Sequence, residues 1–193
     1  MDLKRRLADL DRLSRRPAGA QPGGPGAIDG CATLADLGLV ETDGRLWVRE
    51  HHDALAPPGD ALPELDGFFT RAVPEGLHAG ELLFLDTETT GLAGGTGTIP
   101  FLVGVSWWKG EQLVTRQFFL SGPGREGPFL LALEELAASF RAVITFNGAS
   151  FDLPLIRTRA RLNRLPDPLA DLKVWDLLVP SRRLWGHRLA DCR

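Results

Sequence analysis

The chain has 193 residues and a formal net charge of −3 at pH 7; 44% of its residues are hydrophobic and 24% are charged. This composition excludes a disordered tail and predicts one main globular domain with a small appendage. No apolar run approaches the roughly 20 residues that a membrane-spanning helix needs, and the N-terminus lacks a signal-peptide core. We therefore expect a cytoplasmic protein with no membrane partner.

The first 80 residues divide into three predicted parts. Residues 1–16 are predicted to form an N-terminal helix, because leucines recur there at spacings of four and three. Residues 17–30 are rich in Pro and Gly and are predicted to be a flexible linker. Residues 31–80 are expected to form a small β unit, with a turn at Asp43-Gly44, followed by an extended connection.

From residue 81 onward the pattern predicts an α/β domain with a mixed sheet flanked by helices. Three strands joined by short connections form an antiparallel meander, and alternating helices and strands follow, which is typical of a mixed sheet. The predicted elements are strands at 82–87, 101–108 and 113–120, a helix at 126–140, a strand at 142–146, a helix at 150–164 and a short strand near 174–178.

Two carboxylates, Asp86 and Glu88, stand at the end of the first of these strands, after the apolar run from Leu82 to Leu85. Residues i and i+2 of a strand point to the same face, so both acids are expected at one spot beside a buried sheet. Two anions held that close repel each other unless a cation shares the site, and a divalent metal is the obvious cation. The alternative is a solvated turn at the strand end.

A third acid, Asp152, lies where the strand at 142–146 gives way to a helix, in the run Asn147-Gly-Ala-Ser-Phe-Asp. Ser150 is a candidate N-cap of that helix, and Pro154 is tolerated in its first turn. Backbone N–H groups and the helix dipole favour an anion at Asp152, which would be ready for a metal or substrate contact. Simple complementation of the helix dipole is the alternative.

Positive charge is concentrated late in the chain. Residues 141–193 carry ten Lys and Arg against five acids, a surplus of +5, so the first 140 residues sum to −8. A basic half that follows an acidic site suits a polyanion, although solvated helix faces explain the charge equally well. The arginines considered for phosphate binding are Arg157, Arg159, Arg161, Arg164, Arg182 and Arg183.

Together, the two acidic motifs resemble those of the DEDD (DnaQ-like) 3′–5′ exonucleases of the ribonuclease H-like superfamily. Asp86 and Glu88 match the first motif of that family, and Asp152 matches the second. Over about residues 81–193 the chain also resembles the bacterial YprB-like ribonuclease H-like domains. The segments that carry this resemblance are FLDTETTGLAGGTGTIPFLVG, TFNGASFDLPLI and DLLVPSRRLWGHRL.

The resemblance implies a metal-dependent nuclease that removes nucleotides from 3′ ends of single-stranded DNA or RNA. It implies that Asp86, Glu88 and Asp152 are the catalytic residues and the ligands of two Mg²⁺ or Mn²⁺ ions. Two such ions about 3.5–4 Å apart can activate water and stabilise both the attacking and the leaving oxygen. The predicted nucleic-acid contacts are Thr89, Thr90, Gly91, Asn147, Phe151, Arg157, Arg161, Arg182 and Arg183.

The sequence departs from the family pattern in one respect. DEDD enzymes have a third motif with a further Asp, which would lie beyond DLLVPSRRLW, where this sequence ends at Arg193. Either the domain is truncated at its C-terminus or the site is incomplete. The spacing of Asp176 and His187 does not fit the third motif, and Asp176 is expected to support the site from a strand end. Two alternatives therefore stay open: a nucleic-acid-binding module with weak or no activity, and a protein-interaction module that uses the N-terminal helix.

Overall fold

The computed structural model describes residues 33–42, 46–57, 77–91, 96–122 and 125–185. Apart from Thr33, these residues belong to one compact unit, Leu34–Arg193. The helix expected at 1–16, the linker at 17–30 and His187 lie outside the described residues. Within the described part of the chain, no helix is long and apolar enough to cross a membrane.

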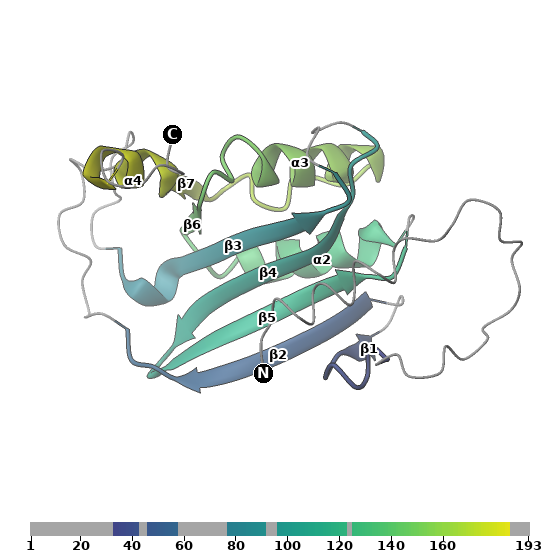
Figure 1. The fold of residues 1–193 in the computed structure, drawn as a ribbon, viewed down its shortest axis with the longest axis horizontal. Helices are drawn as coiled ribbons and strands as arrows, with labels where there is room; N and C mark the ends of the chain where they lie inside the picture. The colour runs from purple at the N-terminus through teal and green to yellow at the C-terminus, as the bar shows by residue number, and fades with distance from the viewer. Residues whose placement is uncertain (1–32, 43–45, 58–76, 92–95, 123–124, 186–193) are drawn as a thin grey trace, which may run out of the picture. The chain divides into compact units, whose positions relative to one another are not determined.

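A seven-stranded sheet with the order β1-β2-β5-β4-β3-β6-β7 forms the centre of the unit (Figure 1). Its strands are β1 (Val40–Thr42), β2 (Leu46–Ala54), β3 (Leu82–Thr89), β4 (Pro100–Lys109), β5 (Gln112–Leu120), β6 (Ala142–Thr145) and β7 (Lys173–Asp176). The helices are the 3-10 turn η1 (Ala79–Glu81), α2 (Glu126–Ala137), α3 (Asp152–Leu162) and α4 (Leu178–Trp185).

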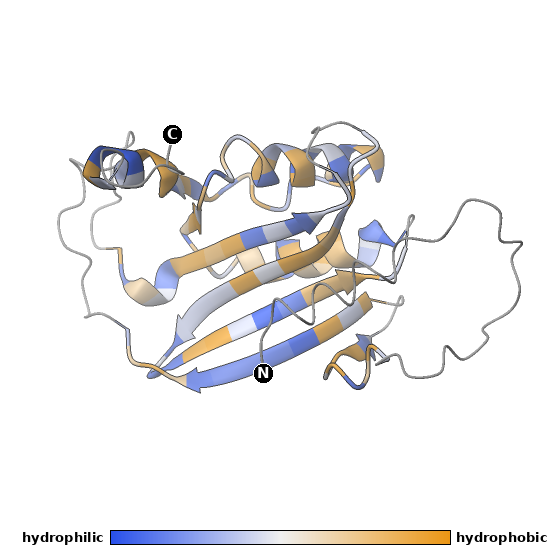
Figure 2. Cartoon of the chain, viewed as in Figure 1, coloured by the Kyte–Doolittle hydropathy of each residue, from blue (hydrophilic) through white to orange (hydrophobic). Residues whose placement is uncertain are grey.

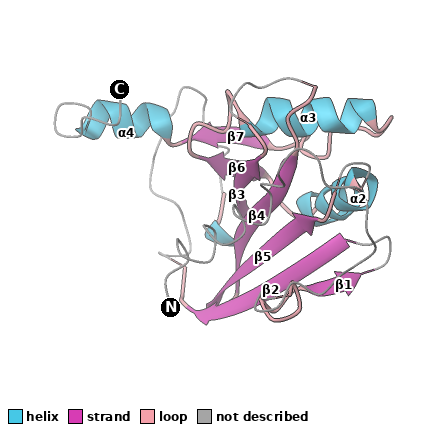
Figure 3. Ribbon diagram, turned by 45° about the vertical axis from the view of Figure 1, so that its right-hand side comes forward, coloured by secondary structure: helices cyan, strands magenta, loops and turns pink. Residues whose placement is uncertain are grey.

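The strand directions confirm the predicted α/β class with its mixed sheet. Strands β3, β4 and β5 form the expected antiparallel meander, while β6 pairs parallel to β3 and β7 pairs parallel to β6. Strands β1 and β2 lie within residues 31–80, and β2 pairs along its whole length with β5. These two strands therefore extend the main sheet at its antiparallel edge (Figure 3).

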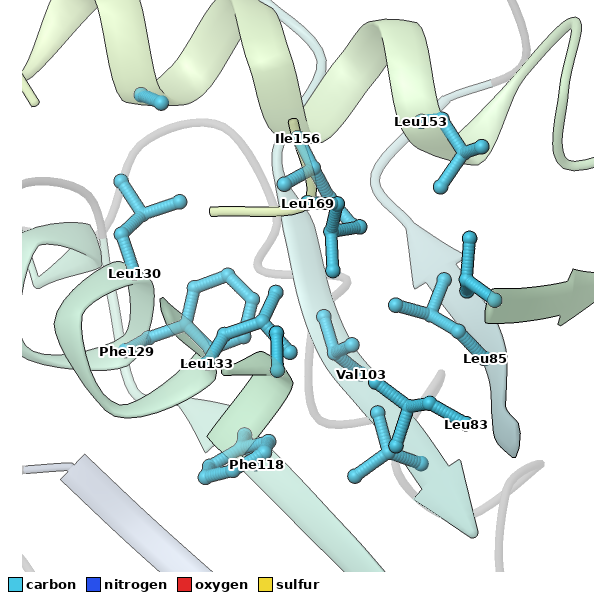
Figure 4. Close-up of a cluster of buried hydrophobic side chains, with 14 of the residues drawn as sticks. Leu83, Leu85, Val103, Phe118, Phe129, Leu130, Leu133, Leu153, Ile156 and Leu169 are labelled. Carbon is cyan, nitrogen blue, oxygen red and sulfur yellow. The ribbon is translucent and has the colours of Figure 1, made fainter. Parts of the chain in front are cut away.

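Helices α2 and α3 cover one face of the sheet and enclose the main hydrophobic core (Figure 4). Phe129, Leu130 and Leu133 of α2 and Ile156 of α3 are buried there with Leu83, Leu85, Val103 and Phe118 of the sheet. On the other face a smaller cluster joins Leu82, Ala142, Ile144 and Trp175. Because β3 and β6 are buried on both faces, they read as continuous apolar runs rather than as alternating ones.

Strand β3 changes character along its length. Its first half is apolar and contributes to both cores, and its last four residues, Asp86 to Thr89, are polar (Figure 2). Leu82 and Phe84 lie on the face with the smaller cluster, so Asp86 and Glu88 lie on that face as well. Thr87 alternates with them and lies on the face that α2 and α3 cover.

Two local expectations are wrong. Ser150 is not the N-cap of α3: the cap position is Phe151, and no side chain caps the helix there. The strand expected near 174–178 ends at Asp176, and helix α4 begins at Leu178. The Asp176 carboxylate accepts a hydrogen bond from the Leu178 N–H (2.9 Å), which satisfies a donor at the start of α4 and favours helix over continued strand.

Candidate functional site

Asp86 and Glu88 lie on neighbouring positions of one sheet face, and both are exposed. Their cross-strand partners on β4 are Gly104 and Leu102, and the β3–β4 register shifts directly after Glu88. Gly104 places no side chain opposite Asp86, so the sheet surface beside this carboxylate is open. An open pocket of about 320 Å³ begins at Asp86, with Ser106, Thr115, Gln117 and the exposed Phe146 among its walls.

The turn between β6 and α3 positions Asp152. Asn147 has a left-handed backbone (φ 65°), a conformation that Asn tolerates better than most residues. A Cβ added at Gly148 would lie 2.6 Å from Cβ of Thr145 and 2.8 Å from Oδ2 of Asp152, so only glycine fits. The Gly148 carbonyl in turn accepts a hydrogen bond from the Leu153 N–H (2.9 Å). The absence of a side chain at Gly148 therefore makes room for the Asp152 carboxylate.

Asp176, at the end of β7, stabilises this turn through hydrogen bonds. One of its oxygens accepts a hydrogen bond from the Asn147 N–H (2.8 Å), and the other accepts one from the Ala149 N–H (2.9 Å). Together with the bond from Leu178, three backbone donors from two segments therefore converge on one carboxylate. Asp176 thus shapes the turn that precedes Asp152, and its supporting role at a functional site stays a prediction.

The Asp152 side chain is buried, with 5% of its surface exposed. It accepts a hydrogen bond from the Thr87 hydroxyl, on the helix-covered face of β3. Burial raises the pKa of Asp152, the Thr87 bond lowers it, and the charges of Asp86 and Asp176 raise it again, with a net rise. Two neighbouring carboxylates, Asp86 and Asp176, therefore act on Asp152.

The sequence placed Asp86, Glu88 and Asp152 together as one metal-binding set. Asp152 contacts the strand from the Thr87 side, and strand alternation places Asp86 and Glu88 on the face of Leu82 and Phe84. Among the described side chains, no group of three or more Asp, Glu, His or Cys is gathered closely enough to hold a metal ion. In donor type and charge the carboxylates fit a hard divalent cation, which prefers oxygen ligands. The three-ligand set stays a prediction.

The two threonines predicted to contact nucleic acid, at the end of β3 and just after it, form hydrogen bonds within the β3–β4 connection. The Thr89 hydroxyl donates to the Gly91 carbonyl (2.9 Å), and the Thr90 N–H donates to the Ile99 carbonyl (3.0 Å). The Thr90 hydroxyl also accepts a hydrogen bond from the Ile99 N–H (3.0 Å). Phe151 is half-buried at the start of α3, and Asn147 is exposed. These residues surround the carboxylates, but their contact with nucleic acid stays a prediction.

The arginines lie in different environments. Arg157 is ion-paired with Asp167 (2.7 Å), and Arg161 is exposed on α3. Arg182 and Arg183 are exposed on α4. Arg159 was wrongly grouped with the phosphate-binding candidates: it is 9% exposed and is bonded to Glu126, so its guanidinium does not face solvent.

Comparison with known families decides the classification of the chain. A family model described as the RNase_H superfamily matches residues 83–193, more than half of the sequence. The chain belongs to the RNase H superfamily. The match begins at the second residue of β3, so it includes all four acids discussed above.

This RNase H superfamily chain is similar to the uncharacterized protein YprB of Bacillus subtilis (strain 168), with 38% identity over 120 residues. The aligned part is 60% of this chain and 28% of that protein, so the chain spans less than a third of its relative. It is also similar to E. coli exonuclease I in complex with a dT13 oligonucleotide, and to the metal-free form of an E. coli exonuclease I complex with single-stranded DNA. Both matches have 22% identity and a TM-score of 0.42, and both cover 55% of this chain and 30% of the other.

Two contributors to the site of this RNase H-like domain were missed at the level of sequence. Thr87, between the two acids, was given no role from the sequence, although its hydroxyl bonds to Asp152. Its position on the opposite face of the strand, toward the helix that carries Asp152, was the available signal. Gly148 was treated as part of a motif, and its steric role follows only from the packing of the turn on Thr145.

Proposed function

We propose that this domain is a metal-dependent nuclease of the DEDD type, which removes nucleotides from 3′ ends of single-stranded DNA or RNA. Asp86, Glu88 and Asp152 would hold two Mg²⁺ or Mn²⁺ ions. The observation that carries the proposal is the buried Asp152, whose carboxylate is held against β3 close enough to Asp86 and Asp176 for both to raise its pKa. Membership of the RNase H superfamily and the likeness to YprB support the same assignment.

The four acidic residues of the site have distinct roles in this proposal. Bound divalent ions would supply a hydroxide near neutral pH and neutralise the charge on the phosphate. Asp86, exposed beside the open pocket, and Glu88, exposed one position further along the same face, can accept a ligand from solvent. Asp152 would exchange its Thr87 hydrogen bond for the cation. Asp176 would keep the turn in place, because its own oxygens are occupied by backbone N–H groups.

The substrate would lie across the end of β3. Thr90 is exposed at this end, and the neighbouring residues Thr96 and Gly97 are exposed as well. Backbone N–H groups and hydroxyls of this kind contact phosphate and sugar without reading base sequence. The exposed Arg161 on α3 adds a positive charge that would attract a nucleic-acid strand.

The test combines metal binding with cleavage. We expect the chain to bind Mn²⁺, measured by isothermal titration calorimetry, and to release mononucleotides from the 3′ end of a 5′-labelled oligonucleotide. Asp86→Ala and Asp152→Asn should each lower the cleavage rate by at least ~100-fold, since each removes charge from the reacting centre. The matched control is Asp171→Asn, an exposed acid on the segment before β7. Equal cleavage by the Asp86→Ala variant would refute the assignment.

A second candidate function is a nucleic-acid-binding module of the same fold without cleavage. It is favoured by the absence, among the described residues, of a group of three metal-ligating side chains. In that case the unmodified chain would bind a labelled oligonucleotide at low salt and leave it intact in Mn²⁺. A chain with no affinity for nucleic acid would support a protein-interaction role instead, for which the N-terminal helix was the sequence-based candidate.

A further inference from the structure

A buried ion pair joins the two helices that cover the sheet. Arg159 of α3 donates from Nε to Oε1 of Glu126 (2.5 Å) and from Nη2 to Oε2 (2.7 Å). The two residues are 9% and 2% exposed, and Glu126 is the first residue of α2. Figure 3 shows α2 and α3 on the same side of the sheet. A two-bond pair of this kind fixes both partners in orientation as well as in distance.

The pair also has a third partner that belongs to neither helix. Nη1 of Arg159 donates to the carbonyl of Thr96 (2.6 Å), a residue of the connection between β3 and β4. Asn163, the C-cap residue of α3, donates to Oε2 of Glu126 (3.0 Å) and to the Arg159 carbonyl (2.9 Å). Arg159 thus directs all three guanidinium nitrogens to the protein, and one of them bonds to the backbone of a loop.

The loop segment that Arg159 holds lies beside the carboxylates. Thr96 precedes Thr98, which is buried, and Ile99, whose N–H and carbonyl both bond to Thr90. Thr90 follows Glu88 by two residues and lies directly after the end of β3. The position of residues 96–99 relative to Glu88 therefore depends on two attachments: the Thr90–Ile99 bonds at one end and the Arg159–Thr96 bond at the other.

Helix α3 connects this loop attachment to Asp152. Asp152 and Arg159 are seven residues apart, about two helical turns, so they share the helix face that packs inward. One end of α3 therefore brings Asp152 to Thr87, and the next two turns bring Arg159 to Thr96. A shift of the helix that moved the carboxylate would also move the loop.

We propose that Arg159 is a positioning residue, which holds residues 96–99 at the edge of the carboxylate site so that this segment can grip a nucleic-acid strand. The inference deepens the proposed nuclease function and rests on it for the identity of the ligand. It assigns Arg159 to the substrate-binding step, through Thr96, and not to the chemical step. Glu126 serves to orient Arg159, and Asn163 orients Glu126.

A purely structural role predicts different behaviour. A buried ion pair contributes little net stability relative to an apolar pair of similar volume, whereas removal of one partner leaves an uncompensated charge. The double variant Glu126→Leu with Arg159→Met therefore restores packing without restoring the bond to Thr96. If Arg159 matters only for folding, this double variant should behave like the unmodified chain.

The test uses Arg159→Lys, the double variant and the matched control Arg141→Lys, an exposed arginine before β6 that is paired with Glu81. For Arg159→Lys and for the double variant we expect KM for a single-stranded oligonucleotide to rise about tenfold or more, the effect of losing one charge-assisted hydrogen bond. The value of kcat should stay within about twofold, and the Kd for Mn²⁺ should not change, because the carboxylates are untouched. Amide hydrogen exchange of residues 96–99 should accelerate in both variants and not in the control.

Two outcomes would overturn the proposal: a double variant with unchanged KM despite faster exchange at residues 96–99, or a fall in kcat without a change in KM. If the unmodified chain proves not to cleave, the proposed nuclease function fails separately. The same variants are then compared by fluorescence anisotropy with the labelled oligonucleotide, where the positioning role still predicts about tenfold weaker binding. Equal anisotropy curves for the variants and the unmodified chain would reject it.

Discussion

Replacement of Asp176 by Asn gives the sharpest test of how the site is built. The carboxylate accepts three backbone N–H groups, with Oδ1 bonded to Asn147 and Leu178 and Oδ2 bonded to Ala149. An amide has only one acceptor oxygen. In its better orientation it keeps the two Oδ1 bonds without their charge, and its NH₂ group faces the Ala149 N–H, where two donors oppose each other.

The expected cost follows from these bonds. A hydrogen bond to a charged group contributes about 1.5–3 kcal/mol, and a neutral one about 1 kcal/mol. Loss of one bond and weakening of two, at a half-buried site where water can replace part of the loss, should lower the free energy of unfolding by about 2 kcal/mol. For a domain of this size that corresponds to a fall in Tm of about 4–8 °C.

The assay pairs thermal unfolding, followed by circular dichroism, with Mn²⁺ titration by calorimetry. Asp176→Asn should lower Tm and accelerate amide exchange at residues 147–151. It should weaken Mn²⁺ binding only through the displaced turn, so a small loss of affinity is expected. Asp171→Asn, at an exposed position before the start of β7, should change neither. A variant with unchanged Tm and abolished Mn²⁺ binding would refute the structural role of Asp176. Asp176 would then be a metal ligand and not a residue that stabilises the turn.

Three further outcomes are expected at the same site. Because burial and the neighbouring carboxylates raise the pKa of Asp152, the folded chain binds this proton more tightly than the unfolded chain, so its contribution to stability falls as pH rises through the raised value. Asp152→Asn should therefore raise Tm at pH 7 without metal, with the difference disappearing in acid; a lower Tm at pH 7 would contradict this account. Thr87→Val removes the hydroxyl that lowers the same pKa, so Mn²⁺ binding, measured calorimetrically, should weaken more at pH 6 than at pH 8. Gly148→Ala forces a Cβ to within 2.6 Å of Cβ of Thr145 and should cost about 1–3 kcal/mol in urea unfolding, whereas Gly127→Ala, which meets nothing within 4 Å, should cost nothing.

The sheet was predictable where local patterns are strong. The apolar runs of β3 and β6, bounded by polar residues, identified both strands, and the short β4–β5 connection at Lys109-Gly110 indicated the hairpin. The pairing of β2 with β5 was not visible in the same way, because these strands are about 60 residues apart and no local feature specifies their contact. The sequence therefore predicted a small β unit, while its attachment to the main sheet required the structure.

The candidate site shows the same division. The alternation of strand side chains placed Asp86 and Glu88 on one face, because that rule depends only on spacing. The contact between Asp152 and Thr87 depends on how α3 lies against the sheet, which no spacing within either segment encodes. Arg159 is the clearest case. Its charge suggested a phosphate contact, while its burial against Glu126 depends on the packing of two helices that are separated in sequence by a strand.

The pairing of Arg159 bears directly on the charge of the site. A buried carboxylate that serves only structure is ordinarily paired with a cation or held by several donors. Helix α3 carries a buried arginine two turns from Asp152, but that arginine is committed to Glu126 and to the Thr96 carbonyl. Among the described residues, Asp152 receives a side-chain hydrogen bond from Thr87, and its charged neighbours, Asp86 and Asp176, are both acids. Arg159 thus neutralises Glu126, whereas Asp152 lies beside like charges. This arrangement is expected if an external cation completes the site.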